Sequence, residues 1–102
     1  MSESAKQTAI LKKLRKIKNG HFTKPTVTND RGIPDIIGHV DGHVIYIEVK
    51  RSNDAEPSVI QRYRIDKLKK QKAIAFWTSS WEDCYNKLRE FLERKGSNID
   101  FL

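Results

Sequence analysis

The chain has 102 residues, of which 37% are apolar and 32% are charged, and this length and composition predict one compact domain. The sequence has no apolar run near the ~18 residues of a membrane-spanning helix, and its N-terminal region lacks the apolar stretch of a signal peptide. The single cysteine, Cys84, excludes an internal disulfide bond, and no Cys/His cluster has zinc-finger spacing. We therefore expect no membrane partner and an intracellular, cytoplasmic location.

Basic residues exceed acidic ones, 20 against 13, and the net charge of +7 favours a polyanionic partner such as nucleic acid. The excess lies in two segments: residues 1–24 hold seven Lys and Arg and one acid, and residues 57–72 hold six and one. In residues 82–95 four bases balance four acids. Two interpretations stay open, namely solvated helix faces or two basic helices that flank a nucleic-acid groove. The second makes Lys6 and Arg62 candidate DNA contacts.

The N-terminal third predicts a helix and then a short strand. Apolar residues at helical spacing indicate an amphipathic helix over residues 3–18, and Asn19-Gly20 is a good stop signal. Residues 21–27 are partly β-branched but contain Pro25, which is typical of an edge strand or an irregular one. Asp30-Arg31-Gly32 predicts a turn.

Two apolar runs, Asp35–Val40 and His43–Lys50, are joined by Asp41-Gly42, which predicts a β-hairpin with a type I′ turn. Both faces of this hairpin are otherwise apolar, so we expect helices to cover both faces of the sheet.

The remaining residues predict a helix, a strand and a last helix. Ser58 is a candidate cap for a helix over residues 59–71, and residues 73–78 form a buried strand. Ser79 or Ser80 then caps a helix that ends at Gly96. The expected order is α-β-β-β-α-β-α, in one domain over residues 1–96. Residues 97–102 are a short tail, either frayed or docked on a partner.

The hairpin register predicts a pair of opposed acids. If Asp41-Gly42 is a two-residue loop, Val40 pairs with His43, and Asp35 then lies directly opposite Glu48, with Cβ atoms about 4.5–5.5 Å apart. The alternation of side chains puts Lys50 on the same face as Glu48. Two like charges at the end of an apolar sheet require a positive charge between them, which is either a divalent cation or Lys50 itself.

This arrangement supports metal-assisted hydrolysis of a phosphodiester. Oxygen ligands from Asp35 and Glu48 favour Mg²⁺ or Mn²⁺ over Zn²⁺, and the backbone carbonyl of Val49 is an extra candidate ligand. Lys50 would position the attacking water or stabilise charge on the phosphoryl oxygens. The alternative is a pair of exposed strand-end acids neutralised by Lys50 and Arg51.

These residues resemble a known nuclease signature. Ile33-Pro34-Asp35 followed by Glu48-Val49-Lys50 is similar to the PD-(D/E)xK motif. With Glu3 in the first helix and Gln61 near the start of the second, the pattern resembles the virus-type replication-repair nuclease (VRR-NUC) domain over residues 3–88. Members often carry Gly-Gly before the last strand, where this chain has Gln71-Lys72.

The resemblance implies an α/β fold with a restriction-endonuclease-like αβββαβα core and a mixed sheet with helices on both faces. It also implies dependence on Mg²⁺ or Mn²⁺ and endonucleolytic cleavage of structured DNA. Stand-alone members occur in phages, are similar in size to Holliday-junction resolvases and tend to be homodimers, so branched DNA and a homodimer are expected. A sequence-specific restriction endonuclease and a non-catalytic DNA-binding module remain alternatives.

The resemblance also implies residue roles. Asp35 and Glu48 would be metal ligands and Lys50 the catalytic lysine, with Glu3 as a helix-borne acid near the metal or its water and Gln61 as a helix-borne amide at the site. Helical periodicity aims Glu3 and Gln61 toward the sheet. The open alternatives are an acid favoured by the helix dipole and a surface amide.

Two basic residues and two tryptophans have further candidate roles. The resemblance implies a phosphate contact at Lys24, although a solvated edge lysine fits equally well, and Arg51 is a second candidate contact to the DNA backbone. Trp77 and Trp81 are expected in the core or at a contact between subunits rather than stacked on bases.

Overall fold

The structure is a computed structural model that describes residues 2–25, 33–52 and 54–102. The turn expected at Asp30-Arg31-Gly32 and the end of the strand expected over residues 21–27 therefore lie outside the described residues. The helices and strands follow the expected α-β-β-β-α-β-α order: α1 (Glu3–Leu14), β1 (Gly20–Thr23), β2 (Ile36–Val40), β3 (His43–Val49), α2 (Val59–Lys70), β4 (Ile74–Thr78) and α3 (Trp81–Arg94).

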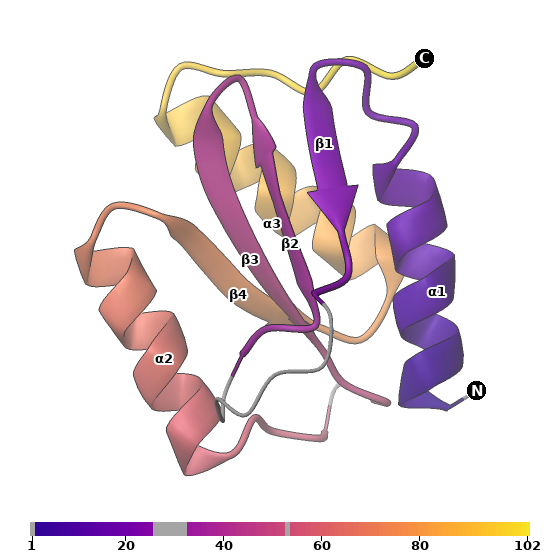
Figure 1. Ribbon diagram of the computed structural model, residues 1–102, viewed down its shortest axis with the longest axis vertical. Coiled ribbons are helices and arrows are strands. Elements are labelled where there is room, and N and C mark those ends of the chain that lie inside the picture. The colour runs from indigo at the N-terminus through magenta and orange to yellow at the C-terminus, as the bar shows by residue number, and fades with distance from the viewer. Residues whose placement is uncertain (1, 26–32, 53) are drawn as a thin grey trace.

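The four strands form one mixed sheet in the order β1-β2-β3-β4. β1 and β2 pair antiparallel, as do β2 and β3, whereas β3 and β4 are parallel. The main core lies between one sheet face and helices α1 and α3, and α2 packs on the opposite face (Figure 1). α2 covers that face only in part, because Val44 stays 43% exposed. The α/β fold class is thus confirmed.

The hairpin has the register that its turn predicts. Asp41 and Gly42 both have positive φ angles, 49° and 80°, as a type I′ turn requires. Val40 pairs with His43, and Ile36 at the far end of β2 pairs with Ile47. The register therefore leads directly from the turn to Asp35 and Glu48 at the other end of the hairpin.

Serine caps begin the second and third helices. Ser58 caps α2, and its hydroxyl accepts a hydrogen bond from the Gln61 amide while the Gln61 side chain accepts one from the Ser58 amide. Of the two serines considered for α3, Ser80 is the cap. Gly96, with φ 77°, follows the helix end as expected.

The first helix is shorter than predicted: α1 ends at Leu14, not at residue 18. Ile17 is buried in a non-helical segment, where it forms an antiparallel bridge with Phe101. The Leu102 amide donates to the Lys16 carbonyl at 2.8 Å, so the C-terminal tail packs against its own chain across the top of the sheet (Figure 1). The contacts of Lys16 and Ile17 with the C-terminal tail thus take the place of the last helical turn that the sequence pattern predicts.

Cys84 and the two tryptophans lie in different surroundings. Cys84 is fully buried, and desolvation raises the pKa of its thiol to about 12. Trp81 packs against the core, as expected. Trp77 is half-buried outside the core, with the Arg62 guanidinium and the Lys87 ammonium each 5.7 Å from a ring centroid. Among the described residues, no helix has the length and apolarity needed to cross a bilayer.

Candidate active site

The predicted site residues meet at the end of the sheet where the parallel strands β3 and β4 finish. Asp35 immediately precedes β2, Glu48 lies near the end of β3 and Lys50 directly follows it. Gln61 lies in the first turn of α2. Because α2 packs on the face of the sheet that carries Glu48, its first turn can reach the carboxylates.

Asp35 extends the hairpin with its side chain. Its Oδ2 atom accepts a hydrogen bond of 2.7 Å from the backbone amide of Val49. β2 begins one residue later, at Ile36, so a carboxylate oxygen takes the place of a backbone acceptor at this point. This contact holds the Asp35 carboxylate against the end of β3, beside Glu48.

Glu48 is buried, with only 5% of its surface exposed, and its pKa is raised from 4.5 to about 9. Desolvation is the largest cause, followed by the hydrogen bond to Asp35 and the negative charge of that residue. Lys50 acts in the opposite direction, with its Nζ atom 4.0 Å from Glu48 Oε1, and Glu3 raises the pKa further. The Asp35 carboxylate therefore opposes the ionisation of Glu48, which lies beside it as the hairpin register predicts.

Gln61 connects the acid to the lysine. Its Nε2 atom donates to Glu48 Oε1 at 2.8 Å, and its Oε1 atom accepts from Lys50 Nζ at 2.8 Å. The same Oε1 accepts the backbone amide of Ser58 at 2.9 Å. Gln61 is thus an inward-facing amide. The structure also adds Ser58 to the site, whereas the sequence predicted this residue only as a helix cap. The Ser-x-x-Gln spacing of a capping box is the signal in the sequence that could have linked Ser58 to Gln61.

Glu3 and Lys6 lie on the first turns of α1, at the same end of the sheet. Glu3 is half-buried and close enough to influence Glu48 electrostatically. Within the described ranges, however, no group of three or more His, Cys, Asp or Glu side chains is arranged to hold a metal ion. Lys6 Nζ donates to the Ser79 carbonyl at 2.8 Å, so it fastens α1 to the end of β4 rather than projecting freely toward a partner.

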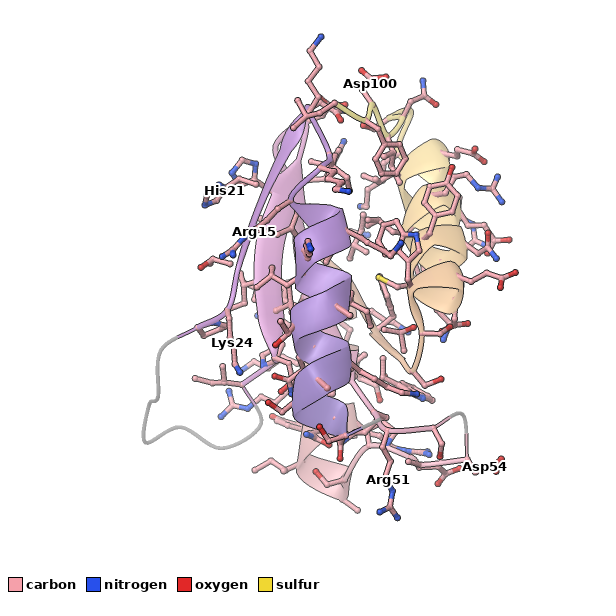
Figure 2. The ribbon with its side chains drawn as sticks, turned by 90° about the vertical axis from the view of Figure 1, so that its right-hand side faces the viewer. Arg15, His21, Lys24, Arg51, Asp54 and Asp100 are labelled. Atoms are coloured by element: carbon pink, nitrogen blue, oxygen red, sulfur yellow. The ribbon has the colours of Figure 1, made fainter. Side chains whose placement is uncertain are left out.

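The other predicted contacts surround this site. Lys24 is exposed just beyond β1, and Arg51 projects from the end of the molecule that carries the carboxylates (Figure 2). Arg62 forms an exposed ion pair of 2.9 Å with Glu56 in addition to its contact with Trp77. Neither Arg62 partner could be predicted from the sequence pattern, because both lie outside its own helix.

The donor set suits a hard divalent cation. Mg²⁺ is commonly bound through one or two carboxylates, with water and substrate phosphate completing its coordination. Asp35 and Glu48 supply that pair, and positive charge beside them would favour the ionised form of Glu48, which its surroundings otherwise oppose. The Val49 carbonyl remains a predicted additional ligand.

Comparison with solved structures identifies proteins of similar fold. A structure described as a VRR_NUC domain has a TM-score of 0.72 at 18% identity, covering 86% of this chain and 96% of its own. A second, described as a VRR_NUC domain protein, has a TM-score of 0.73 at 18% identity, covering 98% and 93%. No protein-family model and no curated protein matches the sequence. The chain thus has the fold of VRR-NUC domains, as the sequence motifs predict.

Proposed function

We propose that the protein is a divalent-metal-dependent DNA endonuclease. The observation that carries this proposal is the acid pair itself: a buried Glu48 with a raised pKa, held beside Asp35 and linked through Gln61 to Lys50. A protein that only bound DNA would gain nothing from two carboxylates close to phosphates, because they repel the ligand. The VRR-NUC fold and the net charge of +7 support a nucleic-acid substrate.

Each residue has a role in this proposal. Asp35 and Glu48 hold Mg²⁺ or Mn²⁺, which, when bound, polarises the scissile phosphate and acidifies a water molecule. Gln61 holds the Lys50 ammonium at 4.0 Å from Glu48, so its charge stays available to stabilise the phosphoryl oxygens during the reaction. Glu3 adds negative charge beside the cation.

We extend the proposal to branched DNA, including four-way junctions, and to a homodimer. A two-fold dimer would present two equivalent sites to opposed strands of a junction. The proposed location is the cytoplasm.

A nicking assay tests the activity. A four-way junction, a linear duplex and a supercoiled plasmid are incubated with Mg²⁺, Mn²⁺ or EDTA. Cutting should require metal, be strongest on the junction, and disappear in Asp35→Ala and Lys50→Ala while DNA binding persists. Asp54→Ala, which removes an exposed acid at the same end of the molecule, is the matched control and should cut like the wild type.

The outcomes separate the parts of the proposal. Strong cutting in EDTA would contradict the metal mechanism, and equal cutting of all three substrates would contradict the preference for branched DNA. Sedimentation analysis that finds only monomers, with and without junction DNA, would contradict the homodimer.

A further inference from the structure

A groove lies along the seam between α1 and β1, outside the acid pair. It has a volume of about 330 Å³, and its floor includes Leu11 of α1 and Ile36 of β2. Lys12, Arg15 and Lys24 line the same hollow, together with the polar side chains of Gln7 and Thr8. We call this hollow the α1–β1 groove.

The groove carries positive charge that the chain does not neutralise. Among its described lining residues none is acidic, and none of its three cations forms an ion pair with another described residue. Arg15 Nε donates to the Phe22 carbonyl at 3.4 Å, which directs this side chain across the seam from α1 to β1. Figure 2 shows Arg15 and Lys24 on the same side of α1, toward β1. The groove is therefore complementary to an anion.

One end of the groove adjoins the start of β2, next to Asp35 of the candidate active site. Ile36 on its floor directly follows Asp35 in the chain. The pairing of Thr23 with Ile37 brings Lys24, the next residue, alongside Ile36. In Figure 2, Lys24 lies between Arg15 and the end of the molecule from which Arg51 projects. Of the three groove cations, Lys24 is thus the one next to the start of β2, and Arg15 lies farther from that end of the sheet.

The length of the groove suits several nucleotides. Gln7 lies one helical turn beyond Glu3 on α1, and Arg15 lies about two turns beyond Gln7. The eight residue steps from Gln7 to Arg15 correspond to about 12 Å of helix, or about 3.5 base-pair steps of DNA at ~3.4 Å each. An elongated polyanion fits this spacing better than a single small anion does.

We propose that the α1–β1 groove binds the phosphate backbone of the DNA arm on one side of the scissile phosphate. Lys24 contacts the phosphates nearest the carboxylates, and Lys12 and Arg15 contact those farther along the arm. This inference rests on the proposed function, because it places the substrate beyond the same acid pair. Under this proposal, the basic N-terminal segment binds phosphates through the cations at the seam between α1 and β1, and not through all the cations of the helix.

The test compares two triple variants with the same change in charge. One is Lys12→Gln/Arg15→Gln/Lys24→Gln. The control, Arg89→Gln/Arg94→Gln/Lys95→Gln, removes three cations from α3 and the residue after it, where charges balance. Affinity for a fluorescently labelled duplex is measured by anisotropy in EDTA at several salt concentrations, and circular dichroism checks that each variant is folded.

The groove variant should lose roughly a hundredfold or more in affinity near 0.1 M salt. The slope of log K against log salt concentration should fall by about 0.9 for each phosphate contact, or nearly 3 in total. The control should keep the wild-type slope. The single variant Lys24→Gln, which leaves α1 unchanged, should lower the slope by about 1.

Wild-type affinity in the groove variant, or equal losses in both triple variants, would overturn the inference, the latter because only net charge would then matter. Binding in EDTA involves no cleavage, so this result is independent of the nicking assay. If the wild type binds through the groove but never cuts, the proposed function fails alone. If it cuts but the groove variant binds normally, the groove inference fails alone.

Discussion

The side chain of Gln61 joins Glu48 to Lys50 through two hydrogen bonds of 2.8 Å, one donated to the carboxylate and one accepted from the ammonium. The same amide oxygen accepts the backbone N–H of Ser58, which caps α2. The start of a helix and the candidate catalytic residues thus share one side chain. Loss of that side chain should therefore affect both the stability of the helix and the alignment of Lys50.

Replacing Gln61 with Ala should lower the cleavage rate of bound DNA about a hundredfold, because Lys50 loses the acceptor that holds it near Glu48. DNA affinity should change by less than about threefold. Removal of the cap contacts should lower the free energy of unfolding by about 1 kcal/mol. Single-turnover cleavage, anisotropy and thermal unfolding measure the three effects.

Ser58→Ala is the matched control, since it removes the cap hydroxyl but leaves the Gln61 side chain in place. It should lose about the same stability and much less activity. If the two variants lose activity in proportion to stability, Gln61 contributes to the helix cap and not to the alignment of the site.

The raised pKa of Glu48 makes the stability of the metal-free protein depend on pH. The folded state keeps this proton up to about pH 9, whereas the unfolded chain releases it near the ordinary pKa of 4.5. Between these values the folded state binds more protons, so the free energy of unfolding should fall as pH rises. Glu48→Gln should remove this dependence, and Tm measured in EDTA from about pH 5 to 9 compares the two proteins.

A bound divalent cation should reverse that loss, because it favours the ionised carboxylate. Mg²⁺ or Mn²⁺ should therefore raise Tm more at pH 8 than at pH 5 in the wild type, and have little effect in Glu48→Gln. A wild-type Tm in EDTA that rises with pH relative to Glu48→Gln would contradict the environment described for this carboxyl group.

The turn between α2 and β4 contains a strained residue. Lys72 has a φ of 72°, a left-handed conformation that glycine adopts at lower cost. Lys72→Gly should therefore stabilise the protein by about 0.5–1 kcal/mol, measured by urea unfolding. Lys67→Gly, at an exposed position three residues before the end of α2, should instead destabilise it by about 1 kcal/mol. Destabilisation by both variants would show that the Lys72 side chain compensates for the strain of its backbone.

Local chemistry explains why much of the fold could be predicted from the sequence. Asp41-Gly42 specifies its own turn, and that turn fixes the register that brings Asp35 to Glu48. The Ser58 cap and the inward direction of Gln61 likewise depend on residues only a few positions apart.

The features that could not be predicted depend on distant partners. Ile17 continues the helical pattern of α1, yet it leaves the helix because Phe101, more than eighty residues later, pairs with it. Lys6 is a surface cation by pattern but donates to Ser79 at the end of β4. The α1–β1 groove likewise requires Lys24 to lie beside α1, a placement that follows from the fold and not from spacing along the chain.

Isothermal titration calorimetry with Mn²⁺ in the absence of DNA tests the central claim most directly, namely that Asp35 and Glu48 form a divalent-cation site. The wild type and the control Asp54→Asn should bind Mn²⁺ alike, whereas Asp35→Asn and Glu48→Gln should each lose the binding heat while remaining folded. Equal Mn²⁺ binding by all four proteins, or none by the wild type, would contradict the claim.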